Sequence, residues 1–451
     1  MIAPYKKVRY YYWLFDSFFK KNIKSLIISF VLGFFLLLFS ITFFPYIVTL
    51  FNRKTEQIGI VGKYTLSNLP DDIKGDLSNP LLIVNPKGEI IPILIKSYEL
   101  LDQNKTYRFF LKSNLKWSNG DIFVAQDMHY TFKGVEQKVI DDTTIEFRLS
   151  QPLSTFPAYL TKPLFKNKTD GVAGLYELSN YYEKNGSLQK ISFSPNKKKI
   201  PFRVYKFYDT DSKLINAYKK GEITHVVNTK KNIADIFSTW KNTKITRSVS
   251  YNQMLTLFFN TNSKLFAEKE AREAFAYALP DVEEYGISAI GPISPLSWAY
   301  NTHLKKNVLD LDKASSLLNK IIEGQKKPQI NFYTFYEYLT IAEEIKKNSE
   351  KIGLFVNLKV ISYLPTDFDI LLTVWNPPPD PDQYYFWHST QDQGNITHYK
   401  NVKIDKLLED GRKIMNINER KNIYEDFQRI LIDDHPALFI YYPYTYTIEK
   451  K

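Results

Sequence analysis

The sequence predicts an α/β protein with two lobes and one N-terminal transmembrane helix. An apolar stretch without a single charge runs from Leu26 to Phe51, which is the pattern of a membrane span. The remaining body, about 400 residues, is too large for one compact core and favours two or three lobes. A strand–helix–strand pattern between residues 329 and 360 is typical of a parallel sheet covered by helices.

The apolar stretch is long enough to cross a bilayer. As a helix it would extend about 39 Å, against a hydrocarbon core of about 30 Å. It ends without the small-residue pattern of a cleaved signal peptide, so we expect a retained anchor. A buried core helix is the alternative, although such helices rarely run this long without a charge. The prediction is a segment at 1–25, an anchor at 26–51 and a body at 52–451.

Charges on either side of the stretch predict its orientation. Six cations and one acid, Asp16, precede it, whereas Arg53 and Lys54 after it are soon followed by Glu56. The positive-inside rule then places the N-terminus in the cytoplasm and the body on the extracellular or periplasmic side. We therefore predict a single-pass protein of the cell membrane. The six cations are Lys6, Lys7, Arg9, Lys20, Lys21 and Lys24.

Composition excludes several classes of protein. The chain is 44% hydrophobic and 16% aromatic, which predicts a folded interior. It has no cysteine, so disulfides, thiolate metal sites, iron–sulfur clusters, a cysteine nucleophile and a lipid-modified cysteine are excluded. The net charge of +12 comes from scattered lysines without interleaved aromatic residues. We expect a solvated surface and no nucleic-acid partner; attraction to an anionic membrane or cell-wall polymer is the alternative.

The first part of the body carries signals for a strand, a turn and a helix. Thr106–Lys112 alternates as a strand does. Asn119-Gly120 is a strong turn signal. Asp127 precedes the segment MHYTF at a position where the first turn of a helix favours an acid, so a helix is expected there.

The segment from residue 329 to 360 predicts a βαβ unit. Gln329–Phe335 has the pattern of a strand, and Tyr338–Lys351 has apolar residues near one helical face, with Gly353 as its stop. Val356, Leu358 and Val360 then alternate as in a second strand. Two strands joined by a helix are parallel neighbours in most sheets.

The C-terminal part predicts a helix followed by a buried strand. Glu419–Asp433 carries apolar residues on one side, with Asn418 as a plausible N-cap, and Pro436 ends it. Ala437–Tyr442 is a continuous apolar run, as in a strand buried on both faces. We expect this strand to return to the lobe in which the body began.

No pattern in the chain indicates catalysis. The six histidines have no metal-binding spacing, and nucleophile-elbow, phosphate-loop and dinucleotide motifs are missing. Adjacent acids such as Asp71-Asp72 lie beside turns or helix ends and are interpreted as caps and surface. We expect no enzyme, no metal site and no cofactor. A surface hydrolase is the alternative, and the only argument against it is the lack of catalytic sequence motifs. The histidines are His129, His225, His303, His388, His398 and His435.

Several segments of the body resemble, in order, those of one family. The first are GEIIPILIKSYEL and KTYRFFLKSNLKWSNGDIFVAQDMHYTF, followed by GLYELSN and KLINAYKKGEI. Next comes LTLFFNTNSKLFAEKEAREAFAYAL, in which Asn260, Arg272 and Ala276 are in step with the family pattern, and then FDILLTVWNPPPDPDQYYFW. The family is extracellular solute-binding protein family 5, the dipeptide and oligopeptide type that serves ABC importers.

The resemblance covers about residues 60–448 and implies a fold. It is the class II, periplasmic-binding-protein-like fold of the large peptide-receptor type, with two α/β lobes and a hinge. The first lobe would comprise about 52–255 and 432–451, with a small inserted subdomain at about 75–165; the second would comprise about 256–431. The implied function is capture of a peptide or similar solute and its delivery to ABC permease and ATPase subunits, with the membrane held through the anchor.

One departure from the family pattern bears on the ligand. In peptide-binding members an aspartate shortly before the Asp-Pro-Asp element pairs with the ligand's ammonium group, and Pro377 or Pro378 fills that place here. The body is also short for the family. A sensor or envelope scaffold that has lost transport is therefore the alternative function.

Five residues are candidates for the solute cleft. Trp375, Asn376 and Asp380 follow the predicted strand Phe368–Val374, and ligands gather at the carboxyl ends of strands in α/β lobes. The alternative is a turn at Asp380-Pro381-Asp382 with Trp375 in the core.

The other two candidates lie elsewhere in the second lobe. Asn260 ends the strand LTLFF, where it is either a cleft residue or a local turn former. Trp298, in GPISPLSWAY, resembles a hinge-side loop of the family; core packing is the alternative.

Overall fold

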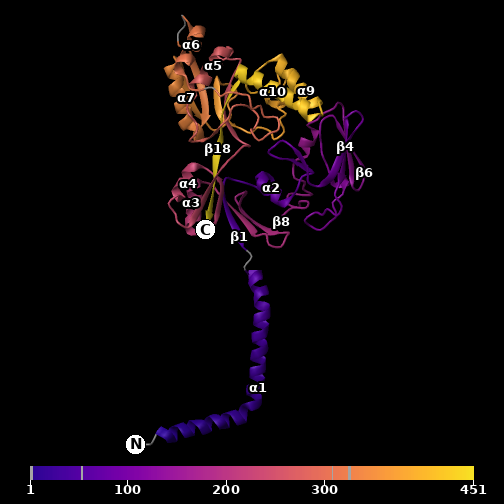
Figure 1. Cartoon of the computed structure of the whole chain (residues 1–451), viewed down its shortest axis with the longest axis vertical. Helices are drawn as coiled ribbons and strands as arrows, with labels where there is room; N and C mark the ends of the chain where they lie inside the picture. The colour runs from indigo at the N-terminus through magenta and orange to yellow at the C-terminus, as the bar shows by residue number, and fades with distance from the viewer. Residues whose placement is uncertain (1–3, 52–53, 307, 324–326) are drawn as a thin grey trace.

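The computed structural model describes residues 4–51, 54–306, 308–323 and 327–451, which form a globular body and one long helix standing away from it (Figure 1). This helix, α1 (Pro4–Phe51), includes the basic segment as well as the apolar stretch, and it bends along its length. By length and composition Arg9–Phe43 could cross a membrane, since a window of 18 residues within it has a mean hydropathy of 2.7 and is not buried against the body. This candidate span begins earlier than the anchor expected from the sequence.

The part of the body next to α1 is built on a mixed sheet. Its order is β8-β9-β10-β1-β11-β18-β12, and β1 pairs in parallel with β10 and β11. Helices α3 (Asp211–Lys220) and α4 (Lys231–Phe237) pack on it, with Leu214, Tyr218 and Phe237 in their shared core. The strands are β1 (Thr55–Val61), β8 (Tyr176–Lys184), β9 (Ser187–Pro195), β10 (Phe202–Tyr208), β11 (His225–Thr229), β12 (Thr243–Val249) and β18 (Ala437–Lys450).

A small antiparallel sheet with its own core lies beside this lobe. Its order is β4-β5-β7-β6, and Tyr107, Phe109 and Phe147 fill its interior. The predicted strand is β5 (Thr106–Leu111), and the predicted turn is present, with Gly120 at φ +93°. The remaining elements here are helix α2 (Asp71–Leu77), 3₁₀ turns η1 (Leu66–Asn68), η2 (Ala125–Asp127) and η3 (Phe156–Leu160), and strands β2 (Leu82–Val84), β3 (Ile90–Pro92), β4 (Ile95–Leu101), β6 (Val135–Asp141) and β7 (Thr144–Leu149).

The second lobe has a sheet between two layers of helices. Its order is β16-β15-β17-β13-β18, with β14 (Gly286–Ser288) also on β18. Helices α5, α6 and α7 contribute to the core on one face, and α8, α9 and α10 contribute to the core on the other. The other elements are β13 (Met254–Phe259), β15 (Gln329–Phe335), β16 (Phe355–Ile361), β17 (Ile370–Trp375), α5 (Lys269–Ala278), α6 (Leu311–Ile322), η4 (Tyr336–Tyr338), α7 (Leu339–Lys351), α8 (Tyr384–Trp387), α9 (Val402–Lys413) and α10 (Ile417–Asp434).

Strand β13 shows why this lobe needs continuous apolar runs. All six of its residues are buried. Leu255, Leu257 and Phe259 face one helical layer, while Met254 and Phe258 face the other. A strand covered on both faces has no position for a polar alternation. The two-lobed α/β fold predicted from the sequence is confirmed, including the parallel pairing of β15 with β16 around α7.

Strand β18 belongs to both sheets. Its first half, residues 437–441, pairs with β13, and residues 444–450 pair with β12 and β11 in the first lobe (Figure 1). The run expected to return to the first lobe, 437–442, thus pairs within the second lobe, and its continuation beyond Pro443 pairs in the first lobe. The strand is 14 residues long because it continues past Pro443, whose missing N–H does not interrupt the pairing of its neighbours.

Two local expectations were wrong. Asp127 ends the short turn η2 rather than starting a helix, because its carboxylate accepts hydrogen bonds from Val124 N (3.0 Å) and Trp117 Nε1 (3.1 Å). Helix α10 is capped by Asn416, two residues before the predicted Asn418, since the Asn416 side chain accepts from the N–H groups of residues 418 and 419.

Candidate functional site

Two neighbouring cavities lie between the lobes, and together we name them the interlobe cleft. Their volumes are about 760 Å³ and 860 Å³, each of a size that small-molecule and peptide sites have. Both are lined by Asp72 of α2 and Val84 of β2 from the first lobe, and by Pro378 and Pro379 from the second. These prolines follow the carboxyl end of β17, where α/β lobes place ligands.

Asp380 lines the larger cavity but is mostly covered. Its carboxylate lies 3.4 Å from Nη2 of Arg420 and accepts a hydrogen bond from the N–H of Asp382 at 2.9 Å. Burial raises the pKa of Asp380, and the Arg420 charge opposes that rise. The two interpretations of this residue from the sequence are thus combined, since Asp380 forms a turn and also lies in the cleft wall.

Trp375 and Asn376 do not line the interlobe cleft. Trp375 is 7% exposed at the end of β17, and its ring packs against Phe386, Trp387 and Phe439. The Trp375 side chain thus lies in a core cluster of the second lobe. Asn376 is exposed, yet it is not among the described residues that line either cavity.

Asn260 lies at the far end of the second-lobe sheet from the cleft. It follows Phe259, which pairs with Ile370, whereas Met254 at the other end of β13 pairs with Trp375. Its side chain accepts from the N–H of Asn262 at 3.0 Å. The position supports the local turn former and not the cleft residue, because a ligand between the lobes would meet the opposite strand ends.

Trp298 joins the two lobes beside the cleft. Its backbone N–H donates to Lys87 O at 2.8 Å, and its indole Nε1 donates to Gly88 O at 3.1 Å. Lys87 and Gly88 belong to the turn between β2 and β3 of the first lobe. Arg420 and Tyr424 of the second lobe also pack against the indole ring. Trp298 is thus an interlobe contact rather than a lining residue of the described cavities.

We expect Gly88→Ala to weaken this contact. Gly88 has φ +79°, and an added Cβ would lie 2.8 Å from Trp298 Nε1. Gly134→Ala is the matched control, since Gly134 has φ +76° and nothing within 4 Å. The backbone strain costs about 1–2 kcal/mol in each, so thermal unfolding of the full chain in detergent should show a larger loss for Gly88→Ala. Equal losses would mean that the Trp298 contact adds no stability.

The cleft contains residues that no sequence motif indicated. Thr155 and Tyr159 come from the first lobe, and Tyr385 and Arg412 come from the second. Arg412 Nε lies 3.1 Å from Asp382 Oδ2, and its Nη2 donates to the Tyr159 hydroxyl at 3.1 Å, which bridges the lobes. Asp72 was interpreted as a helix-end acid, and it does lie in the first turn of α2. Its position in the cleft depends on segments about 300 residues away, such as Pro378 and Pro379, so the sequence around Asp72 does not indicate it.

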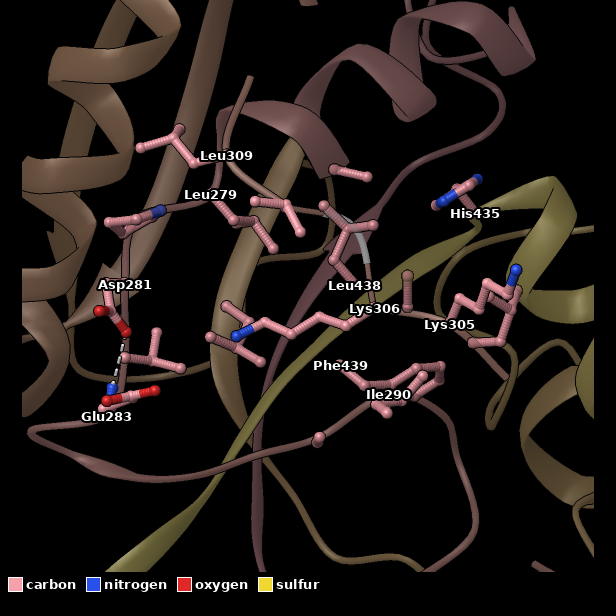
Figure 2. Close-up of a pocket in the computed structure, with 18 residues that line it drawn as sticks. Leu279, Asp281, Glu283, Ile290, Lys305, Lys306, Leu309, His435, Leu438 and Phe439 are labelled. Carbon is pink, nitrogen blue, oxygen red and sulfur yellow. Dashed lines mark hydrogen bonds between the residues drawn. The ribbon is translucent and has the colours of Figure 1, made fainter. Parts of the chain in front are cut away.

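A further cavity lies inside the second lobe, away from the interlobe cleft. It has a volume of about 410 Å³ and apolar walls from β18 and α5, with Lys305 and Lys306 among the lining residues (Figure 2). Lys306 Nζ donates to Ser288 Oγ at 2.8 Å. Among the described residues its lining runs from Ala276 to Ile440, and β18 contributes only the half that pairs in the second lobe, so a molecule bound there would not bring the two lobes together.

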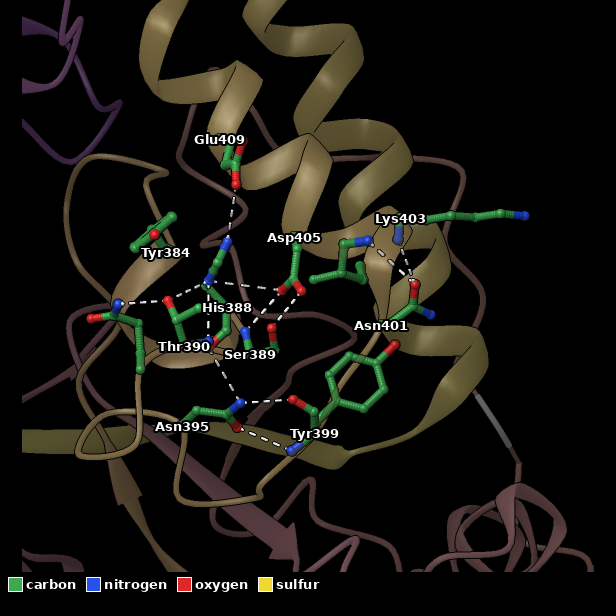
Figure 3. A network of polar contacts seen from close by, with 12 residues as sticks. Tyr384, His388, Ser389, Thr390, Asn395, Tyr399, Asn401, Lys403, Asp405 and Glu409 are labelled. Carbon is green, nitrogen blue, oxygen red and sulfur yellow. Dashed lines mark hydrogen bonds and ion pairs between the residues drawn. The ribbon is translucent and has the colours of Figure 1, made fainter. Parts of the chain in front are cut away.

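A polar network around His388 stabilises the loop before α9 (Figure 3). His388 Nδ1 lies 2.8 Å from Thr390 Oγ1, and Ser389 donates to Asp405 through both its N–H and its hydroxyl. The serine hydroxyl therefore contacts a carboxylate rather than the imidazole, and the arrangement is not that of a nucleophilic triad. Among the described residues no group of three His, Cys, Asp or Glu side chains could hold a metal ion.

Known proteins share this fold over most of its length. The chain is 23% identical to the oligopeptide-binding protein AppA of Bacillus subtilis, covering 86% of each protein. The structure of AppA in complex with a nonapeptide superposes with a TM-score of 0.71 at 20% identity, covering 88% of this chain and 94% of AppA. NikZ from Campylobacter jejuni in complex with Ni(L-His) gives a TM-score of 0.74 at 21% identity, with the same coverage.

A family model identifies the chain more directly. The model describes bacterial extracellular solute-binding proteins, family 5, and matches residues 89–396, which is more than half of the sequence. The matched range includes the whole four-stranded small sheet and most of the second lobe, together with Pro378, Pro379 and Asp380 of the cleft. The chain belongs to the bacterial extracellular solute-binding proteins of family 5, as its sequence motifs predicted.

Proposed function

We propose that this protein is a membrane-anchored receptor that captures a peptide outside the cell and delivers it to an ABC importer. The interlobe cleft carries the proposal, since a solute there would contact both lobes at once. Relatives named for oligopeptide and dipeptide binding support the solute class. The partners would be ABC permease and ATPase subunits, and no step of the function requires catalysis.

The shared strand β18 supports a clamp. We infer that the first lobe comprises residues 54–255 and 444–451, with the subdomain at about 75–165, and that the second comprises 256–443; the boundary within β18 follows its change of partners. Trp298 and Arg412 already join the lobes through hydrogen bonds. In the proposed mechanism a bound solute adds contacts to both lobes and favours the closed form.

Helix α1 would hold the receptor near its transporter. Its length and apolar composition are those of a membrane span, and the cations before it favour a cytoplasmic N-terminus. A tether raises the effective concentration of the receptor at the permease, which free diffusion outside the cell would dilute. The proposed location is the cell membrane, with the body on the extracellular or periplasmic side.

The test is thermal unfolding of the full chain in detergent with libraries of di-, tri- and tetrapeptides, with sugars and metal chelates as comparison solutes. A ligand at about 100 times its Kd should add about 2.7 kcal/mol to the free energy of unfolding. A rise in Tm with peptides alone supports the proposal. No rise with any peptide would contradict it and favour a sensor or scaffold, as would purification without permease or ATPase subunits.

A further inference from the structure

The interlobe cleft has the opposite charge to the rest of the protein. The chain carries a formal charge of +12. Its two cavities are nevertheless lined by four aspartates and one arginine, with no lysine among the described lining residues: Asp71, Asp72, Asp380, Asp382 and Arg412. Acidic side chains outnumber basic ones in this lining, a distribution that favours a cation over an anion there.

Three of the four carboxylates already have a cationic neighbour. Asp380 pairs with Arg420 at 3.4 Å, and Asp382 pairs with Arg412 at 3.1 Å. Asp71 lies 3.6 Å from Lys74 in an exposed pair, which contributes little at a surface.

Asp72 differs from the other three. It lines both cavities, and no described residue forms an ion pair or hydrogen bond with its carboxylate. Its charge is therefore available to a ligand.

A second observation at the same cavity also points to a ligand. Thr155 is only 2% exposed, and its hydroxyl has no hydrogen-bond partner among the described residues. A buried hydroxyl without a partner is costly, and few native groups remain so. Thr155 lines the larger cavity together with Asp72, so a hydrogen-bonding group entering that cavity would offer the missing partner.

Aromatic rings in the cavity suit the same kind of ligand. Tyr159 and Tyr385 line it and are 45% and 51% exposed. The Tyr384 ring is covered by the Arg412 guanidinium and by His388, so it is not available. Partly exposed aromatic side chains in the same cavity as an unpaired carboxylate suit an ammonium group, which cation–π contact attracts as well as charge.

We propose that Asp72 binds a cationic ammonium group of the solute, so that the first lobe selects for ligands with a free amino group. This inference rests on the proposed function and specifies its ligand chemistry. Pro378 and Pro379 on the second lobe offer neither charge nor N–H donors to the same cavities. The two second-lobe acids of the larger cavity, Asp380 and Asp382, are already paired with arginines, so the charge selection is assigned to Asp72 of α2.

The experiment compares one tetrapeptide library before and after acetylation of all its amino groups. The full chain in detergent is titrated with both forms, and the rise in Tm gives an apparent affinity for each. We expect acetylation to remove most of the rise. In Asp72→Asn the affinity for the unmodified library should fall about tenfold, the order of loss for one hydrogen bond to a charged group, and acetylation should then have little further effect.

Two variants make the result specific to the charge in the cleft. Asp72→Glu keeps the charge and should retain preference for the unmodified library. Asp211→Asn removes an exposed acid from the first turn of α3, outside both cavities, and should bind as the native chain does. Since Asp72 is exposed, Asp72→Asn should fold, and its Tm without peptide checks this.

The outcomes separate the inference from the function beneath it. If both forms of the library raise Tm equally, or if Asp72→Asn keeps the native preference, the Asp72 assignment is overturned while peptide binding stands. If neither form raises Tm, the proposed function fails and the inference fails with it.

Discussion

Arg420→Leu is expected to lower the free energy of unfolding by about 3–5 kcal/mol, the loss for breaking a buried ion pair on one side. Arg420 and Asp380 are each 7% exposed, and the guanidinium also donates through Nε to Gly411 O at 2.9 Å. Without the arginine, the Asp380 carboxylate stays buried with only the N–H of Asp382 as a described partner. Urea unfolding of the full chain in detergent measures the loss.

The same substitution should make stability depend on pH. Burial already raises the pKa of Asp380, and the Arg420 charge is what restrains it. In Arg420→Leu that pKa rises further, so above the ordinary aspartate value of about 3.9 the native state binds a proton that the unfolded chain does not. The free energy of unfolding should therefore increase as pH falls from 8 towards 5, and the deficit should shrink.

Two controls accompany this substitution. Lys406→Ala removes an exposed pair with Asp410 on α9 and should cost less than about 1 kcal/mol. Arg420→Leu combined with Asp380→Asn should be less dependent on pH than Arg420→Leu alone, because no carboxylate remains to titrate there. A loss below about 1 kcal/mol without pH dependence would show that the pair is solvated.

Trp375→Ala is expected to cost about 3–5 kcal/mol, as for other large-to-small changes in a core. The indole contacts Phe386, Trp387 and Phe439 with ring centroids 5.3 to 6.1 Å apart. Trp375→Phe should cost less because it keeps part of the aromatic volume, and Tyr363→Ala, at a side chain 81% exposed, should be nearly neutral. Unfolding experiments on the three variants give this order.

The same variants distinguish a core tryptophan from a ligand contact. Peptides should raise the Tm of Trp375→Phe by as much as they raise the Tm of the native chain. If Trp375→Phe kept its stability but lost the peptide response, the assignment of Trp375 to the core would be wrong.

The fold was predictable because its signals are local. The βαβ unit follows from alternation in β15 and β16, helical periodicity in α7, and Gly353, which takes φ +105° where the helix stops. The expectation of a helix at Asp127 was wrong because one hydrogen-bond partner of its carboxylate, Trp117 Nε1, lies ten residues away in the sequence. Similarly, both Asn416 and Asn418 lie at the start of α10, and a sequence pattern locates a helix end only to within a residue or two, so the wrong asparagine was predicted as the N-cap.

The cleft was less predictable because it is assembled from distant segments. The loop after β17 could be found, since strand ends in α/β lobes attract ligands, and Asp380 is in the wall. The sequence did not indicate which residues of this segment face the cavity, and the Trp375 side chain lies in the core. Asp72 and Thr155 reach the same cavity from positions 83 residues apart, and neither carries a motif.

The strand that joins the sheets has a consequence for biosynthesis. His225 pairs with Glu449, and Leu257 pairs with Leu438. Both sheets are therefore completed only by residues that are synthesised about 180 to 220 positions later. Contacts of such sequence separation form slowly. Neither lobe can close its sheet until these residues have been synthesised, and the incomplete sheets expose apolar edges prone to aggregation. The body is thus expected to depend on chaperones until β18 is in place.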